Sequence, residues 1–314
     1  MRLVTYRWDG GYRIAAEERM GLVDLERATV ARLRAEGDPD ADAFGRVLVP
    51  ADPLAFLRAG ERALAAARES IAYAAEARDV TVDGTPIIRE KGAVSLAAPV
   101  PRPGKIIAIG LNYADHAKES GAQLPAEPVI FPKWATSVVG PGEPVIHPGP
   151  EITEQLDYEV ELAVVIGKAG KRIPEAAAWE HVAGYTVLND ISARDLQFRD
   201  GQWMKGKALD TFAPMGPCLV TKDAIADPHD LTIRLRLNGE LMQDSSTAQL
   251  IFGIPRLIAF LSRLMTLEPG DVISTGTPSG VGFARQPPVF LQPGDLMQAE
   301  IEGIGVLENR VVAA

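Results

Sequence analysis

The segment LDYEVELAVVIG, residues 156–167, alternates apolar and acidic side chains with the period of a β-strand. One face of such a strand would be apolar and consists of Tyr158, Val160, Leu162 and Val164. The other face would carry carboxylates, those of Asp157, Glu159 and Glu161. Like charges on one face repel, and their burial without a cation is costly. The segment therefore indicates either a site for a divalent cation, which prefers oxygen ligands, or the solvated outer face of a surface strand.

Other segments after residue 104 also have the length and composition of strands. They are KIIAIGL (105–111), GYTVLND (184–190) and LTIRLRL (231–237). One amphipathic helix is expected over residues 257–265, where apolar residues recur at helical spacing. Many strands and few helices predict an α+β, mainly β fold with a curled or folded β-rich core.

The first part of the chain combines signals of strand and helix. Asp-Gly pairs at residues 9–10 and 83–84 are typical of hairpin turns, and residues 53–78 are rich in Ala, Leu, Arg and Glu, which favour a helix. The segment AAPVPRPG (97–104) contains three prolines, which favour an extended connector. We therefore predict a small N-terminal α+β domain over residues 1–98, a linker over 99–104 and a catalytic domain over 105–314.

The overall charge and the cysteine content limit the classes of partner and compartment. The formal net charge is −10 and no block of Lys or Arg occurs, which argues against nucleic acid and membrane surfaces as partners. The single cysteine, Cys218, cannot form an intrachain disulfide, which favours a reducing compartment. The sequence shows no apolar leader and no apolar segment of membrane-spanning length. These features predict a cytoplasmic protein.

A further acidic residue, Asp190, ends the predicted strand 184–190 and precedes a loop, a common place for functional side chains. Asp190 is therefore a candidate third ligand for the cation expected at Glu159 and Glu161. An Asx turn or a helix N-cap is the alternative interpretation of an Asp in this position.

The segment NYADHAKES, residues 112–120, follows the predicted strand 105–111 and would form a short helix. His116 and Glu119 are three residues apart, so they would lie on the same side of that helix. A carboxylate that holds the tautomer of an imidazole makes the imidazole a suitable general base. A solvent-facing pair without function is the alternative.

Two lysines and a glycine-rich loop are further candidates for contacts with a substrate. WMKGK (203–207) offers cations for a substrate carboxylate, with solvated lysines as the alternative. STGTPSGVG (274–282) allows an anion to approach the backbone closely, with a plain tight loop as the alternative. This loop is neither a G-x-G-x-x-G nor a Walker sequence, so it does not indicate nucleotide binding.

Seven segments of the chain, in this order, resemble the fumarylacetoacetate hydrolase family over about residues 102–312. The segments are GLNYADHAKES, EPVIFPKW, LDYEVELAVVIGK, GYTVLNDISARDLQ, WMKGKALDTFAPMGP, LNGELMQDSST and GDVISTGTPSGVG. The stretch FARQPPVFLQPGD (283–295) resembles the branch formed by the mitochondrial domain-containing-protein-2 homologues of animals and their bacterial relatives.

The resemblance implies a mixed β-sandwich roll, usually assembled as a homodimer. The metal ligands that it implies are Glu159, Glu161 and Asp190. The metal would be Mg²⁺, with Mn²⁺ or Ca²⁺ as alternatives, and Asp157 is left out because it falls where relatives carry other residues. His116 would be the base and Glu119 its orienting carboxylate, on a short lid. The residues implied to contact the polar groups of the substrate are Gln197, Lys207, Thr277 and Lys133.

The resemblance also implies a reaction class, a Mg²⁺-dependent enzyme that acts on a small 2-oxo acid through a metal-stabilised enolate. Lys207 and Thr277 would stabilise the developing oxyanion, and His116 would activate water or move a proton at C3. Acylpyruvate- or fumarylpyruvate-type hydrolysis, oxaloacetate decarboxylation and oxaloacetate tautomerisation all remain open. A 2-oxopent-4-enoate-type hydratase or isomerase is the alternative enzyme, and a metal-binding scaffold protein is the non-enzymatic alternative. Leu111 stands where acylpyruvate-cleaving relatives often carry Arg, which argues against a simple transfer of their substrate preference.

Overall fold

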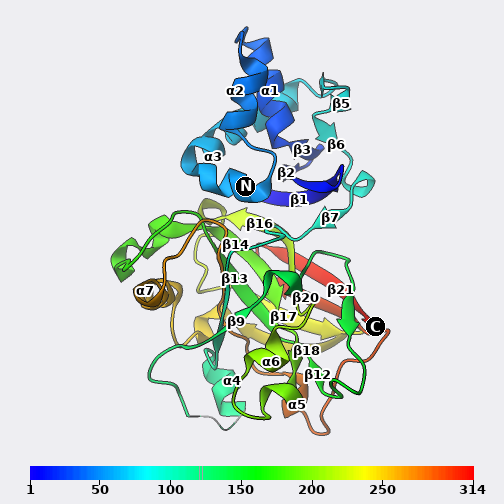
Figure 1. Ribbon diagram of the computed structural model, residues 1–314, viewed down its shortest axis with the longest axis vertical. Helices are drawn as coiled ribbons and strands as arrows, with labels where there is room; N and C mark the ends of the chain where they lie inside the picture. The colour runs from blue at the N-terminus through cyan, green and yellow to red at the C-terminus, as the bar shows by residue number, and fades with distance from the viewer. Residues whose placement is uncertain (120, 122) are drawn as a thin grey trace.

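Strands dominate the structure, a computed structural model that describes residues 1–119, 121 and 123–314 (Figure 1). The larger of its two main sheets has twelve strands, ten of which follow the order β6-β3-β2-β1-β16-β14-β13-β19-β8-β9, while β7 pairs with β1 and β10 with β16. The bounds are β1 (Arg2–Trp8), β2 (Gly11–Glu18), β3 (Gly21–Asp24), β6 (Ile88–Arg89), β7 (Leu96–Ala97), β8 (Ile106–Gly110), β9 (Val129–Lys133), β10 (Val138–Val139), β13 (Val160–Ile166), β14 (Val182–Asn189), β16 (Ala213–Thr221) and β19 (Val272–Ser274).

The smaller main sheet has five strands in the order β11-β21-β20-β17-β18. Its bounds are β11 (Val145–His147), β17 (Thr232–Leu237), β18 (Glu240–Ser246), β20 (Leu296–Ile301) and β21 (Gly305–Ala313). Two short pairs complete the strands, β4 (Thr81–Val82) with β5 (Thr85–Pro86) and β12 (Leu156–Asp157) with β15 (Ser192–Ala193). The α-helices are α1 (Leu25–Ala35), α2 (Ala41–Leu48), α3 (Pro53–Glu76), α4 (Ala114–Glu119), α5 (Arg194–Gln197), α6 (Met204–Lys207) and α7 (Ile254–Leu264). The predicted α+β, mainly β fold is confirmed.

The two main sheets share one buried apolar core. Leu162 and Val164 of β13 belong to the same buried cluster as Ile233 of β17 and Ala299 of β20. Removing each large aliphatic side chain from water contributes about 1.5–3 kcal/mol, so this core is the main source of cohesion between the sheets. Val160, Leu162 and Val164 share this core, as the alternation in the sequence predicted. The opposite face of β13 therefore carries Glu161.

Local sequence signals for turns and helices are confirmed. Asp9 and Gly10, between β1 and β2, have φ values of 47° and 73°, the positive values that a two-residue hairpin turn requires. The predicted helix over 53–78 corresponds to α3, which is interrupted at Gly60, where φ is 64° and ψ is −146°. The predicted helix over 257–265 lies largely within α7. Among the described residues, no helix is both long enough and apolar enough to cross a bilayer.

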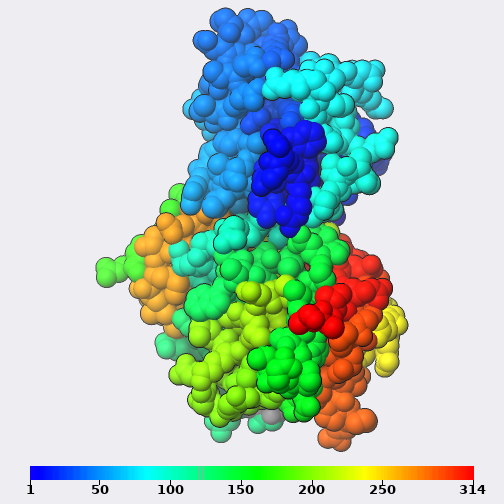
Figure 2. Space-filling model, turned by 45° about the vertical axis from the view of Figure 1, so that its right-hand side comes forward, coloured from blue at the N-terminus to red at the C-terminus, as the bar shows by residue number. Residues whose placement is uncertain are grey.

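The N-terminal strands are continuous with the large sheet. Arg2 and Leu3 of β1 pair with Val220 and Leu219 of β16. The first part of the chain forms the upper lobe in Figures 1 and 2, with α1 and α2 above β1 and β2 and α3 beside them, and the remaining sequence lies below it. A sheet that crosses from one lobe to the other fixes their relative position through backbone hydrogen bonds. The division at residues 98 and 105 stays a prediction.

Candidate metal and active site

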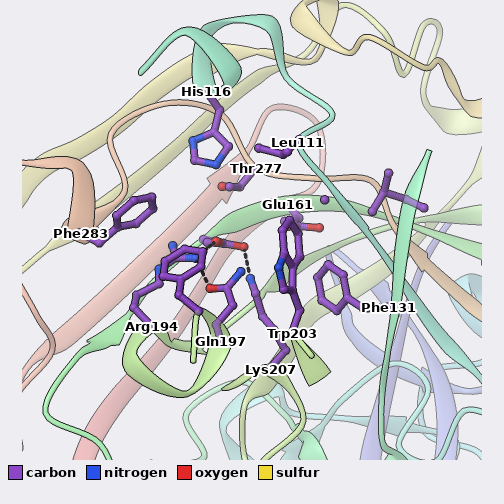
Figure 3. Close-up of a pocket in the computed structure, with 14 residues that line it drawn as sticks. Leu111, His116, Phe131, Glu161, Arg194, Gln197, Trp203, Lys207, Thr277 and Phe283 are labelled. Atoms are coloured by element: carbon purple, nitrogen blue, oxygen red, sulfur yellow. Dashed lines mark hydrogen bonds and ion pairs between the residues drawn. The ribbon is translucent and has the colours of Figure 1, made fainter. Parts of the chain in front are cut away.

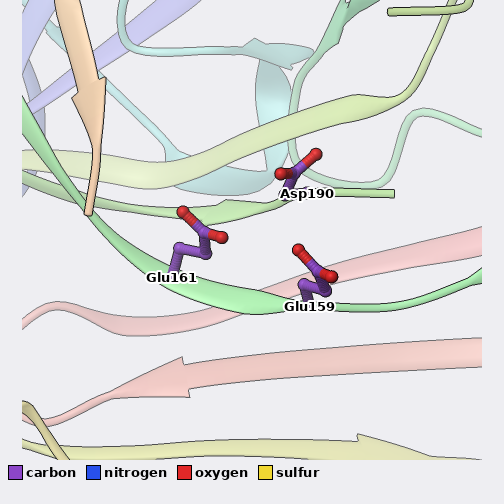
Figure 4. Close-up of side chains that lie close together, drawn as sticks. All are labelled: Glu159, Glu161 and Asp190. Atoms are coloured by element: carbon purple, nitrogen blue, oxygen red, sulfur yellow. The ribbon is translucent and has the colours of Figure 1, made fainter. Parts of the chain in front are cut away.

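Three buried carboxylates meet where β13 and β14 pair, and we call Glu159, Glu161 and Asp190 the acidic cluster (Figure 4). Each offers an oxygen within 4.8 Å of the others. Asp190 N–H donates to the carbonyl of Glu159 at 2.8 Å, so the two chain segments are held together at this point. The exposed fraction of Glu159 is 5%, that of Glu161 is 1% and that of Asp190 is 0%. The alternative of a solvated outer strand face is therefore wrong.

Cations surround one side of the acidic cluster. Lys207 Nζ donates to Glu159 Oε2 at 2.6 Å and to Asp190 Oδ2 at 3.0 Å, and Arg194 Nη1 lies 2.7 Å from Glu159 Oε1. Burial alone would raise the pKa of Glu159, but Lys207 and Arg194 outweigh it and hold the pKa at about 2. Burial would likewise lower the pKa of Lys207, but Asp190 and Glu159 outweigh it and raise the pKa. Glu159 is thus a carboxylate beside a charged ammonium group.

Glu161 has a different environment. Its Oε2 accepts hydrogen bonds from Ser274 Oγ at 2.5 Å and from Gly276 N–H at 2.9 Å. Burial, reinforced by the charges of Asp190 and Glu159, raises the pKa of Glu161 to about 8. Among the described residues, no Lys or Arg forms an ion pair with Glu161, whereas Glu159 and Asp190 both pair with Lys207, and the donor set of the cluster consists of hard carboxylate oxygens. Both properties fit a divalent cation, which would let Glu161 ionise.

Asp157 does not share the acidic face that strand alternation predicted. The strand is interrupted after β12, and β13 begins only at Val160, so the side chain of Asp157 points elsewhere. Its carboxylate accepts from Arg194 Nε at 2.8 Å and from the N–H groups of Gly282 and Phe283 at 2.7 and 3.1 Å. The omission of Asp157 from the ligand set agrees with these contacts.

A cavity of about 260 Å³ adjoins the acidic cluster (Figure 3). The sequence-predicted residues that line it are His116, Glu159, Glu161, Gln197, Lys207 and Thr277. The volume lies below the ~300–1,000 Å³ that is typical of sites for drug-sized ligands. The cavity therefore suits a small polar molecule.

His116 and Glu119 form the pair that their spacing predicted. His116 Nδ1 lies 3.4 Å from Glu119 Oε2, and Glu119 Oε1 accepts from Gly280 N–H at 2.9 Å. His116 extends from α4 toward Thr277, on the opposite side of the cavity from Lys207 (Figure 3). The imidazole thus faces the cavity, while residue 120, the last of the quoted segment, lies outside the described residues.

Lys133 lies behind the acidic cluster and not in the cavity. Its Nζ donates to the Asp190 carboxylate, to the carbonyl of Lys207 and, at 3.3 Å, to the carbonyl of Ile191. An ammonium group has three donors, and these contacts use all of them. Lys133 is not among the described residues that line the cavity. The ammonium group of Lys133 is therefore engaged by protein groups, and its contact with a substrate stays a prediction.

Thr277 and Gln197 are also held by neighbours. Thr277 Oγ1 donates to the carbonyl of Val160 at 3.0 Å and accepts from Gln243 Nε2 at 2.9 Å. Gln197 Oε1 accepts from Arg194 Nη1 at 2.9 Å, which fixes the orientation of its amide. Both side chains are therefore positioned before any ligand binds.

Sequence reasoning missed Arg194 and the aromatic walls of the cavity. Arg194 bridges Asp157 and Glu159, and its Cζ lies 4.5 Å from the ring centre of Phe283. Trp203 packs edge-on to Phe131, with 5.7 Å between the two ring centres. Residue 110 must be a glycine for this packing, because a Cβ on Gly110 would lie 2.3 Å from the indole ring of Trp203. The need of the acidic strand for counter-charge was a signal for a buried cation, but sequence gives no means of choosing Arg194 among many arginines.

A mainly β chain with a buried three-carboxylate site beside a small cavity has the features of a metal-dependent enzyme for small polar substrates. Residues 105–312 match the family model described as fumarylacetoacetate (FAA) hydrolase, C-terminal. The chain belongs to the fumarylacetoacetate hydrolase family, and the predictions of this family and of an enzyme are confirmed.

Three curated relatives support the predicted branch. The mitochondrial oxaloacetate tautomerase of Rattus norvegicus is 49% identical over 277 residues, which cover 88% of this chain and 84% of the relative. The fumarylacetoacetate hydrolase domain-containing protein 2 of Pongo abelii is 50% identical over 259 residues, which cover 82% of this chain and 78% of the relative. The oxaloacetate tautomerase of Bacillus subtilis is 47% identical over 266 residues, which cover 84% of this chain and 87% of the relative.

Solved structures share the fold over the whole chain. The fumarylacetoacetate hydrolase from Exiguobacterium antarcticum is 38% identical with a TM-score of 0.78, and each chain is covered to 100%. The maleylpyruvate hydrolase from Sphingobium, solved with manganese(II) and pyruvate, is 30% identical with a TM-score of 0.72 and the same coverage. The predicted family fold is therefore confirmed, and the acidic cluster together with this manganese-bound relative indicates a divalent metal site.

Proposed function

We propose that this chain catalyses the keto–enol tautomerisation of oxaloacetate with a divalent cation held by the acidic cluster. The arrangement that carries the proposal is a small cavity lined by Glu159 and Glu161 of the acidic cluster, with Lys207 and His116 on opposite sides of it. Tautomerisation moves one proton from C3 and places one on the 2-oxygen, so it needs charge near the oxygen and a base near C3. Relatives 47–49% identical carry the name oxaloacetate tautomerase, which supports this choice of substrate.

The chain's own residues would divide this work between the two sides of the cavity. When bound, the cation would supply a Lewis acid for the carboxylate and 2-keto oxygens of the substrate. Lys207 adds positive charge where the 2-oxygen becomes an oxyanion. His116, oriented by Glu119, would remove the proton from C3, and the enolate oxygen would take a proton from solvent to give the enol. In the reverse direction the enol would lose its O–H proton to solvent and the imidazolium would return a proton to C3. Phe131, Trp203 and Phe283 line the cavity with apolar surface, which would strengthen these interactions by lowering the local polarity.

Mg²⁺ is the proposed native metal, with Mn²⁺ or Ca²⁺ as alternatives, because three carboxylates offer hard oxygen ligands. A homodimer in the cytoplasm is also part of the proposal. The dimer is supported by the position of β9, which is the last strand in the order of the large sheet. The next residue, Trp134, has an exposed fraction of 48%. An apolar edge of this kind is commonly covered by a partner.

Acylpyruvate hydrolysis is the second candidate, and the maleylpyruvate hydrolase of the same fold supports it. Leu111, which lines the cavity, stands where acylpyruvate-cleaving relatives often carry Arg, so their substrate preference does not transfer directly to this chain. Oxaloacetate decarboxylation shares the same enolate and stays open to test. Hydration or isomerisation of 2-oxopent-4-enoates ranks behind these reactions.

The reactions are separated by their products. Purified protein with Mg²⁺ should be given oxaloacetate and acetylpyruvate, and enol absorbance, CO₂ release and pyruvate formation should be followed separately. We expect accelerated keto–enol exchange of oxaloacetate that His116→Ala largely removes. Pyruvate and acetate from acetylpyruvate at a higher rate would favour the hydrolase, and no acceleration beyond free Mg²⁺ would reject the proposal.

A further inference from the structure

The helix that carries His116 is too short to hold its own position. α4 has six residues, and isolated helices shorter than about 12–15 residues are marginal in water. Its place over the cavity therefore depends on contacts with the remaining protein. Glu119 makes one such contact, to Gly280, at the C-terminal end of the helix.

Asp115 makes the corresponding contact at the N-terminal end. Its Oδ2 accepts from Ser245 Oγ at 2.6 Å and from Ser279 Oγ at 3.3 Å. Its Oδ1 accepts from the N–H of His116 at 2.8 Å. A carboxylate in the first turn of a helix is also favoured by the helix dipole. One side chain thus fixes both the helix and the backbone of the proposed base.

Ser245 links this contact to the second sheet. It lies on β18, the strand that ends the five-stranded sheet, whereas Glu161 lies on β13 of the large sheet. The distance between His116 and the acidic cluster therefore depends in part on how the two sheets pack against each other. Small displacements matter here, because an error of about 1 Å in the position of a catalytic group costs about 10²-fold in rate.

We propose that Asp115 is a positioning residue that, through Ser245, holds His116 at its working place above the acidic cluster. This inference rests on the proposed function, in which His116 moves the proton at C3. Asp115 itself does not line the cavity among the described residues. Its effect on turnover should consequently pass through His116 alone.

A double-mutant cycle tests this dependence. Asp115→Ala should lower kcat about 10²-fold with little change in KM, and Ser245→Ala should lower it less. In the His116→Ala background, Asp115→Ala should cause no further loss, because the group it positions is already gone. Mn²⁺ binding measured by calorimetry should be unchanged in all variants. The exposed neighbour Asp244, which pairs with Arg234 at 2.7 Å, provides the matched control Asp244→Ala.

The outcomes separate this inference from the proposed function. If His116→Ala retains the wild-type rate, the proposed role of His116 fails. If His116→Ala is slow but Asp115→Ala is as fast as Asp244→Ala, only the positioning role fails. A further loss from Asp115→Ala in the His116→Ala background would also overturn it, because Asp115 would then act by another route. Should Asp115→Ala not fold, Asp115→Asn and Ser245→Ala, with thermal melting as the check, decide the question in the same cycle.

Discussion

The ammonium group of Lys207 lies 2.6 Å from Oε2 of Glu159, inside the acidic cluster that we propose binds the metal. This contact balances charge between two side chains that are both almost fully buried. In the proposed reaction, the same ammonium group would stabilise the negative charge that develops on the 2-oxygen of the oxo acid. Under this proposal, metal binding and oxyanion stabilisation would use adjacent atoms of one network.

Replacing Lys207 should separate these two roles. Lys207→Met keeps the apolar stem and removes the charge, so turnover should fall by about 10²–10³-fold. Metal affinity should stay equal or increase, because one cation no longer competes for Glu159 and Asp190. Calorimetry with Mn²⁺ and steady-state rates measure the two effects, and Lys205→Met, on an exposed pair with Asp200, is the control. A loss of metal binding together with rate would contradict the assigned role.

Metal uptake should release a proton from Glu161. The pKa of Glu161 is raised to about 8, so the group is mainly protonated in metal-free protein at pH 7. A ligand carboxylate must be ionised, so metal affinity should rise by about tenfold per pH unit below pH 8 and level off above it. Calorimetry of metal binding in buffers of different ionisation enthalpy measures the number of protons that are released per metal bound. Equal affinity at pH 6 and pH 8 would show that Glu161 is already ionised or is not a ligand.

His116 should matter for rate and not for metal binding. His116→Ala should reduce turnover by about 10²–10⁴-fold, the usual range for a general acid–base. Its imidazole is not part of the acidic cluster, so Mn²⁺ affinity should remain within error of the wild type. His147→Ala, outside the cavity, serves as the control. A rate close to that of the control would return His116 to a structural role.

The chain should form a dimer in solution. Light scattering should report about twice the 33.7 kDa chain mass, since the edge of the large sheet at β9 is available for a partner. Ile130→Lys, on β9 and 36% exposed, should weaken the dimer if this edge is the interface. An active monomer at every concentration would show that the site works without a second copy.

Strand alternation in the sequence predicted the core face of β13 and the shared location of Glu159 and Glu161, but it also placed Asp157 there, and it left a solvated face open as the alternative. Side chains at residues 160–164 alternate between the two faces of the strand, and this alternation depends only on backbone geometry. The structure therefore shows the predicted alternation within β13. The interruption before Val160 was not predictable in this way. At this interruption, the carboxylate of Asp157 accepts hydrogen bonds from the N–H groups of Gly282 and Phe283. These two donors lie 125 and 126 residues after Asp157 in the sequence.

The placement of cations was the least predictable part of the candidate site. Lys133 and Lys207 are both lysines next to strands or loops in the sequence, yet only Lys207 lines the cavity. The difference arises because the carbonyl of Lys207 and the carboxylate of Asp190 take up the donors of Lys133. Such partners come from folded segments far apart in the chain, and no local pattern indicates them.

The central claim is that the acidic cluster binds one divalent cation and that this cation is needed for tautomerisation. The most direct measurement strips the protein with EDTA, titrates it with Mg²⁺ and follows the enol absorbance of oxaloacetate at each step. We predict no acceleration in stripped protein and a saturable return that ends at one metal per chain, with Glu161→Ala remaining inactive throughout. Full acceleration by the stripped protein would contradict the account.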